Sequence, residues 1–294
     1  MNQKTKSFIL LHLIVFLWGW TAVLGKIITL PALQMIWIRV IITFVGILGY
    51  ALYKKTPLFP SGKIILQLLL IGLLVGIHWI CFYGAVKASN VSITLACFAT
   101  GTLFTSLLEP LFYRRKVLFY EILFGIIVIG ALLMIFNVEI RYFWGILLGL
   151  GAALTSSLMA VVNSIMSRKG LKAEMISVYE MIGCLTCISI FLYVLEPQTA
   201  TFYGISGMDW MYMLIFSIFC TMIPFIIGVE ILKHISPYTM SLTLNLETIY
   251  GILFAFFIFN SSEHMSSTFY IGAAIILGVV CLDAYMKREK TEKG

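Results

Sequence analysis

The sequence contains few charged residues. Only 11% of its 294 residues are Asp, Glu, Lys or Arg, and 61% are hydrophobic, whereas soluble domains are about 25% charged and about 45–50% apolar. A chain of this length could form one or two soluble domains, but it has too few polar residues to cover their surfaces. We therefore exclude a soluble protein and expect one that folds in a lipid bilayer.

The sequence also lacks the motifs of ATP-driven pumps and of intramembrane enzymes. It contains neither the GxxxxGK[ST] loop that binds ATP phosphates nor the HExxH motif of zinc proteases. Its four histidines are scattered along the chain, as His12, His78, His234 and His264. We therefore expect no enzyme activity, no catalytic residues, no metal site and no cofactor.

Ten long apolar runs fill most of the chain. Each is close to the about 20 residues that a helix needs to cross about 30 Å of hydrocarbon. They cover residues 8–30, 33–53, 63–86, 91–113, 117–136, 143–165, 176–195, 208–232, 237–259 and 268–286. The first run is too long for the apolar part of a signal peptide. Because the connections are short, the sequence predicts an all-α polytopic membrane protein of ten transmembrane helices.

Lys and Arg residues gather in alternate connections. Ten spans place both termini on one side, and the connections on that side include Lys54, Lys55 and Arg168. Positive residues stay in the cytoplasm during insertion, so we expect cytoplasmic termini and a bacterial inner membrane. The net charge of +7 then reflects topology, and we expect no nucleic-acid partner. Arg39 falls near the opposite side, close enough for its side chain to reach the outer surface; a role as an anchor of the fold is the alternative.

A faint internal repeat relates two parts of the chain. Residues 86–110 align with residues 232–256 at a shift of 146, and the alignment pairs Thr102 with Thr248. In both parts a very short turn joins two predicted spans. The agreement in position indicates that the chain contains two related halves.

The turns of the repeat also carry matching helix signals. Asn90 can cap the helix that follows it, and Ser236 followed by Pro237 offers a cap with proline at the first helical position. Five spans fall in residues 1–140 and five in residues 141–294, so we expect two inverted five-helix repeats. Inverted repeats recur in transporters, with the substrate site near the membrane midplane between the halves.

Six stretches of the chain carry a family pattern. They are LWGWTAVLGK (17–26), IWIRVIITF (36–44), GAVKASNVSITLACF (84–98), LLEPLFYRRK (107–116), LKHISPYTMSLTLNLETIYGILFAFFIF (232–259) and YIGAAIILGVV (270–280). Together they resemble the EamA-like branch of the drug/metabolite transporter superfamily, which often has proline where this chain has Thr248. The resemblance implies a secondary transporter that exports amino acids or other small metabolites.

One acidic residue, Glu247, stands near the centre of the predicted span 237–259. An acidic side chain at the centre of a membrane helix costs about 2.5–3.5 kcal/mol, and such residues usually face a cavity or a partner. Residues three and four apart share a helix face, which groups Glu247 with Thr243 and Tyr250. This stripe is our leading candidate for a substrate site.

Two interpretations of this acid stay open. Its repeat mate is Gly101, so the carboxylate occurs in one half only, as expected for a group that contacts a substrate amine or carries a proton. In the alternative, structural interpretation, a neutral glutamic acid forms a hydrogen bond with a neighbouring helix, for example with Asn163 or His78.

Other polar and aromatic residues are expected to line the same space. Aromatic walls with a few placed polar groups are typical of small-molecule pockets, although hydroxyls and small residues can also serve only helix packing. With Glu247, the predicted substrate-binding residues are Trp18, Thr21, Trp79, Tyr83, Asn163, Thr243, Asn245 and Tyr250.

The predicted mechanism is alternating access by two rocking halves. The cavity is expected to lie between the spans at 8–30, 63–86, 91–113, 143–165, 208–232 and 237–259. The expected partners are a small-molecule substrate and membrane lipid, with a proton and a second copy of the chain as further options. A small-solute channel or facilitator and a multidrug efflux carrier stay as alternatives.

Overall fold

The computed structural model describes residues 3–114, 119–138, 140–259 and 265–293, and these form helices and short connections without any strand. The predicted span 117–136 begins just outside the described residues. The helices are α1 (Gln3–Ile27), α2 (Ala32–Tyr53), α3 (Gly62–Ala88), α4 (Val91–Phe98), α5 (Gly101–Tyr113), α6 (Phe119–Val138), α7 (Phe143–Arg168), α8 (Ala173–Leu195), α9 (Gly207–Ser217), α10 (Ile223–Ile231), α11 (Pro237–Phe259) and α12 (Ser267–Lys293). Two 3-10 turns, η1 (Ile140–Tyr142) and η2 (Pro197–Thr199), and a π-helical turn, η3 (Ile218–Met222), complete the set.

Eight segments of the described chain are long and apolar enough to cross a membrane. In two of them consecutive elements form one span, α4 with α5 over Val91–Tyr113 and α9 with η3 and α10 over Gly207–Ile231. The apolar parts of α6 and α12 are shorter, at Leu123–Ile135 and Ser267–Val279. Together these segments match the ten predicted helices.

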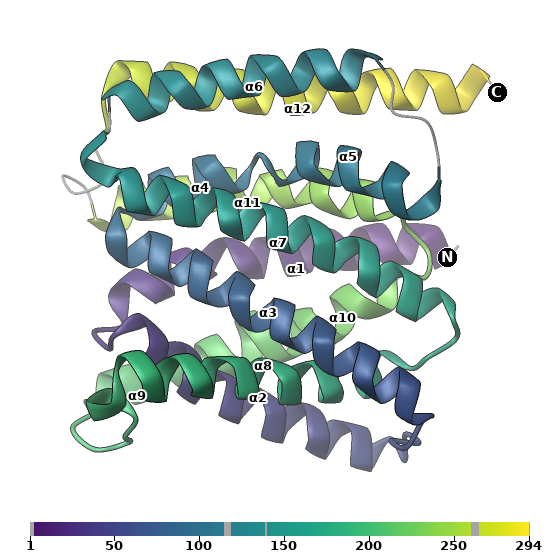
Figure 1. Ribbon diagram of the computed structural model, residues 1–294, viewed down its shortest axis with the longest axis vertical. Coiled ribbons are helices and arrows are strands. Elements are labelled where there is room, and N and C mark those ends of the chain that lie inside the picture. The colour runs from purple at the N-terminus through teal and green to yellow at the C-terminus, as the bar shows by residue number, and fades with distance from the viewer. Residues whose placement is uncertain (1–2, 115–118, 139, 260–264, 294) are drawn as a thin grey trace.

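The helices lie side by side with both chain ends on one side of the bundle (Figure 1). The α2–α3, α7–α8 and α10–α11 connections lie on the side of the chain ends, and the α1–α2, α3–α4 and α8–α9 connections lie on the other. Helices α6 and α12 pack against each other at one edge of the bundle, through a cluster that includes Ala131, Ile135 and Phe269. The remaining helices form the main body.

Hydrogen bonds between the halves follow the internal repeat. The Thr102 hydroxyl of α5 donates to the Ser241 carbonyl of α11 at 3.0 Å, and the Thr248 hydroxyl of α11 donates to the Leu95 carbonyl of α4 at 3.1 Å. A shift of 146 residues maps Thr102 onto Thr248 and Leu95 onto Ser241, so the two bonds are equivalent. The aligned segments therefore cross each other symmetrically, in keeping with two inverted repeats.

Both predicted helix caps are present. The Asn90 side chain accepts a hydrogen bond from the Ile93 amide at 2.9 Å, and the Ser236 hydroxyl accepts one from the Thr239 amide at 3.1 Å. The same shift relates Ile93 to Thr239. Each cap satisfies an amide that the first turn of a helix leaves without an intrahelical partner, and so fixes where α4 and α11 begin.

The predicted span 91–113 is present as Val91–Tyr113, but it consists of two helices. Helix α4 ends at Phe98 and α5 begins at Gly101. Between them the Thr100 hydroxyl donates to the Cys97 carbonyl at 2.7 Å. Such local side-chain bonds compete with the helical pattern of backbone bonds. Helix α11 is continuous through Thr248, where the family often has proline.

Candidate functional site

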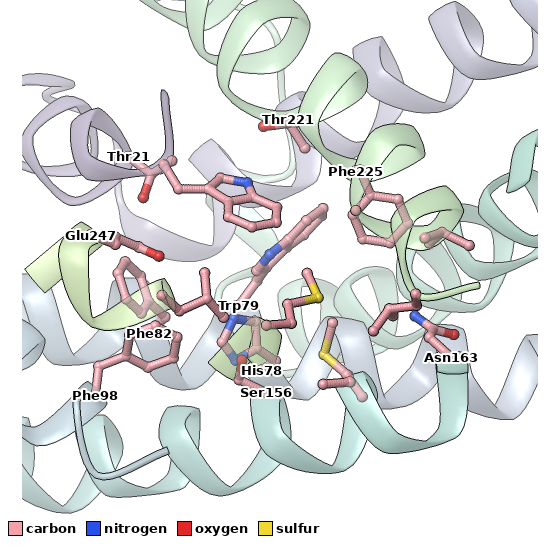
Figure 2. A pocket seen from close by; sticks show the side chains of 18 of the residues that line it. Thr21, His78, Trp79, Phe82, Phe98, Ser156, Asn163, Thr221, Phe225 and Glu247 are labelled. Carbon is pink, nitrogen blue, oxygen red and sulfur yellow. The ribbon is translucent and has the colours of Figure 1, made fainter. Parts of the chain in front are cut away.

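Helices of both halves enclose a cavity with a volume of about 120 Å³. One water needs about 10–15 Å³ on the same scale, so the cavity has room for several waters or for part of a small metabolite. Figure 2 shows Glu247 at one end of the cavity, Asn163 at the other and Trp79 between them.

All six spans that were expected to enclose the cavity contribute to its wall. The contributing residues include Trp18 and Thr21 of α1, Trp79 of α3, Phe98 of α4, Asn163 of α7, Phe225 of α10 and Glu247 of α11. A seventh span, α2, contributes Arg39. In the described structure the wall therefore carries a carboxylate, Glu247, and a guanidinium, Arg39.

Glu247 points into the cavity (Figure 2) and is only 5% exposed. Its carboxylate forms no hydrogen bond or ion pair within the described part of the chain. Asn163 and His78, its partners in the structural interpretation, face other groups instead: Asn163 Nδ2 lies 3.5 Å from Glu180 Oε2, and a ring nitrogen of His78 lies 3.0 Å from the Ala152 carbonyl. Since a buried carboxylate needs hydrogen bonds or a cation, Glu247 is available to a ligand.

Arg39 is held inside the protein by aromatic rings. Its guanidinium carbon lies 4.1 Å from the ring centroid of Trp79 and 4.3 Å from that of Phe216. Its Nε donates to the Thr221 hydroxyl at 2.8 Å, and its Nη1 has no hydrogen-bond partner among the described residues. The expectation that Arg39 reaches the outer surface was wrong: the side chain is 2% exposed, because cation–π contacts, worth up to about 2 kcal/mol when desolvated, retain it.

The π-helical turn η3 positions the acceptor for Arg39. Within this turn the Thr221 hydroxyl donates to the Phe216 carbonyl, five residues earlier, at 2.8 Å. Pro224 follows in the first turn of α10 and has no backbone N–H to continue the regular pattern. This arrangement leaves the Thr221 oxygen free to accept from Arg39, and π-helical turns of this kind are frequent at functional sites.

Tyr83 lines the cavity beside Arg39. Its ring centroid lies 4.9 Å from the Arg39 guanidinium carbon, and it shares the cavity wall with Glu247. A phenol group therefore stands next to the basic side chain of the cavity.

The rest of the wall is largely apolar. The rings of Trp79 and Phe225 meet edge to face, with centroids 6.2 Å apart. A ring nitrogen of His78 lies 3.0 Å from the Ala152 carbonyl of α7, which fixes the imidazole between α3 and α7, with Phe98 next to it at 5.9 Å between centroids. These rings offer an apolar surface beside the two charges.

Six of the nine predicted site residues line the cavity and three lie outside it. The residues of the wall are Trp18, Thr21, Trp79, Tyr83, Asn163 and Glu247. Outside it, the Thr243 hydroxyl donates back to its own helix, and the Asn245 amide donates to the Thr102 hydroxyl at 2.7 Å. The ring of Tyr250 packs edge-on against Phe16, with centroids 5.6 Å apart.

The grouping of Glu247 with Thr243 and Tyr250 is corrected by the orientation of α11. The cavity side of this helix carries Met240, Leu244 and Glu247. Both groupings satisfy a spacing of three or four residues, so periodicity could not choose between them. The packing of α11 against α4 and α5 decides which side faces the cavity.

Sequence reasoning did not include Arg39 or Thr221 in the site. Arg39 is the only charged residue within the predicted span 33–53, and an isolated intramembrane charge is a recognised signal of function. Its nearness to the span end favoured the surface interpretation instead. Thr221 carries no comparable signal, because its role depends on the π-helical turn.

A helical membrane bundle whose inverted halves enclose a cavity with charged side chains has the architecture of a secondary transporter. The family model of the EamA-like transporter family matches residues 5–137 and again residues 143–283. The chain belongs to the EamA-like transporter family, as the resemblance in sequence implied, and is a multi-pass membrane transporter.

The fold is shared with proteins of known structure. One solved structure, described only as the crystal structure of a protein, is similar to this chain with a TM-score of 0.71 and 12% sequence identity. The similarity covers 96% of this chain and 99% of the other. At this identity the likeness shows the fold alone. No curated protein matches the sequence.

Proposed function

We propose that the protein is a carrier that exports amino acids across the inner membrane of a bacterium. The observation that supports this proposal is the pair of unlike charges in one cavity. Among the described residues, neither the Glu247 carboxylate nor the Nη1 of Arg39 has a hydrogen-bond partner, and both side chains line the cavity. An amino acid brings an ammonium group to the first and a carboxylate to the second.

The geometry suggests how such a substrate would bind. The ammonium group meets Glu247, and the carboxylate meets the free side of the Arg39 guanidinium, a group well suited to carboxylates. Trp18, Trp79 and Phe225 then contact the side chain of the substrate. Because this part of the wall is aromatic, we expect a preference for amino acids with apolar side chains.

Transport follows from rocking of the two halves, which we place at residues 1–140 and 141–294. The cavity then opens first to the cytoplasm, where the termini lie, and afterwards to the outside. The Thr102 and Thr248 bonds lie where the halves cross, so the rocking axis is expected to pass close to them.

Counterflow in proteoliposomes tests the proposal. Vesicles containing the purified protein are loaded with a mixture of unlabelled amino acids, and entry of labelled amino acids is followed. The wild-type protein is expected to exchange them with saturation, and Glu247→Gln to lose at least 90% of the exchange. Glu230→Gln is a matched control, because Glu230 pairs with Lys233 at 2.6 Å outside the cavity.

Each other outcome contradicts a defined part of the proposal. Non-saturating flux without counterflow would indicate a channel or facilitator. Exchange of aromatic cations but not of amino acids would indicate multidrug efflux. Full exchange by Glu247→Gln would remove this carboxylate from the substrate site.

A further inference from the structure

A second carboxyl group, Glu180 of α8, is buried beside the cavity. Its side chain is 0% exposed. Its Oε1 has no hydrogen-bond partner among the described residues, and its Oε2 lies 3.5 Å from the Asn163 Nδ2. That distance is beyond the usual 2.7–3.2 Å of an N–H···O bond. The substrate site proposed above makes no use of this group.

Two more buried oxygens near Glu180 lack partners. Asn163 lines the cavity, and its Oδ1 forms no hydrogen bond within the described chain. Ser177 stands one turn before Glu180 on α8, and its Oγ has none either. Buried polar atoms are normally bonded, and a proton on the Glu180 carboxyl would give this group a hydrogen that it could donate to a neighbouring acceptor such as Asn163 Oδ1.

No cation of the neighbouring helices compensates Glu180. Helices α2, α3, α7 and α10 pack against α8. The charged or titratable side chains on these helices and on α8 are Arg39, Lys63, His78, Cys81, Tyr83, Lys87, Arg168, Glu174, Tyr179, Cys184, Cys187, Tyr193 and Glu230, together with the more exposed tyrosines Tyr50 and Tyr53. In the described structure none of the cations forms an ion pair with Glu180.

Helices α3 and α8 are in close contact at the level of Glu180. A methyl group on Gly72 of α3 would overlap the Glu180 carbonyl oxygen, and one on Gly183 would overlap the Leu69 carbonyl oxygen. The two helices therefore touch backbone to backbone at this level. The described residues include no group of three or more His, Cys, Asp or Glu side chains that could hold a metal ion, so we consider a proton as the cation that Glu180 binds.

We propose that Glu180 binds and releases one proton in each transport cycle and so couples substrate export to the proton gradient. The proposal rests on the function proposed above. The proton reaches a Glu180 carboxylate oxygen from water in the cavity when the cavity opens to the outside. It leaves, and the carboxylate forms again, when the cavity opens to the cytoplasm.

Asn163 is the connection between this carboxyl group and the cavity. The oxygen and nitrogen of an amide can exchange places by a half-turn of the side chain. After this turn Oδ1 faces Glu180 and accepts the hydrogen of a protonated carboxyl, while Nδ2 faces the other way. An ionised Glu180 favours the present orientation, with Nδ2 facing the carboxylate. Protonation of Glu180 therefore changes which atom of the Asn163 amide faces the cavity.

Transport driven by an imposed pH gradient tests the proposal. Proteoliposomes with and without a pH gradient receive a mixture of labelled amino acids. Glu180→Gln, which imitates the protonated carboxyl, is expected to keep counterflow within about twofold of the wild type but to lose accumulation driven by the gradient. Glu174→Gln, at the start of the same helix, is the matched control and should keep both.

Two results would overturn the proposal, and a third concerns the substrate site instead. Gradient-driven accumulation by Glu180→Gln, or its absence in a wild type that exchanges, overturns the role of Glu180. Absence of wild-type exchange refutes the proposed substrate class. In that case infrared spectra of the purified protein still decide, because the wild type must show a band of a protonated carboxyl that Glu180→Gln lacks, whereas a band from Glu247 would be present in both.

Discussion

Replacing Arg39 by Gln tests whether Arg39 recognises a substrate carboxylate or only supports the fold. In the described structure one guanidinium nitrogen of Arg39, Nη1, has no partner, and Nε is bonded to Thr221 at 2.8 Å. A substrate carboxylate would occupy the free side. Glutamine fills a similar volume and removes the charge, so the variant loses the bond between two charged groups.

The size of the effect follows from one charge-assisted hydrogen bond. Such a bond contributes about 1.5–3 kcal/mol, and about 1.4 kcal/mol corresponds to a factor of ten. Arg39→Gln should therefore reduce the kcat/KM for an exchanged amino acid by about ten- to hundredfold or slightly more. For the corresponding amine, which lacks only the carboxylate, Arg39→Gln should reduce kcat/KM less than about threefold, because this substrate forms no bond with the guanidinium.

The assay compares the two substrates in the same proteoliposomes. Thr221→Val serves as a control, since it removes the acceptor of Nε and leaves the guanidinium charge in place. Thr221→Val should reduce the kcat/KM for both substrates to a similar, small extent. If Arg39→Gln slows the amino acid and the amine equally, Arg39 supports the fold and does not recognise a carboxylate.

Two further predictions concern stability, measured as the melting temperature of the purified protein in detergent. Gly72→Ala should destabilise the protein by about 1–3 kcal/mol, because the added methyl group meets the backbone of α8. The control Gly130→Ala should have no destabilising effect, because the space around Gly130 is open. Equal melting temperatures of the two variants would contradict the close approach of α3 and α8. Asp209→Ala should cost about 1.5–3 kcal/mol, because the carboxylate accepts from the Thr29 amide at 3.0 Å, the Thr29 hydroxyl at 2.8 Å and the Ser206 hydroxyl at 2.8 Å. An unchanged melting temperature would mean that this link between α9 and the α1–α2 connection does not hold the bundle.

Much of the fold could be predicted because its signals are local. The length of each apolar run determines a span, and Asn90 and Ser236 mark helix starts through bonds only three residues long. The pairing of Thr102 with Thr248 was visible as one identity in a weak alignment, and the structure gives it a physical basis in two equivalent bonds.

The cavity wall was only partly predictable because it depends on contacts between distant segments. Arg39 is buried by Phe216 and bonded to Thr221, far along the chain from it, and nothing in the 33–53 run signals those neighbours. At the break between α4 and α5 the Thr100 hydroxyl bonds to the Cys97 carbonyl of the preceding turn. A threonine can form such a bond in a continuous helix as well, so Thr100 alone does not predict the break. Tertiary context decides both.

The site combines a symmetric framework with asymmetric charges. The Thr102 and Thr248 bonds repeat in both halves, but the repeat mate of Glu247 is Gly101, whose carbonyl accepts from the Ser157 hydroxyl of α7 at 2.6 Å. At this point α5 packs against α7, while the equivalent point on α11 faces the cavity. The carboxylate of Glu247 therefore has no like-charged mate from the other half, and it can stay ionised to meet a single ammonium group. The symmetric bonds therefore position the halves, and the residues without a repeat mate define what the cavity can bind.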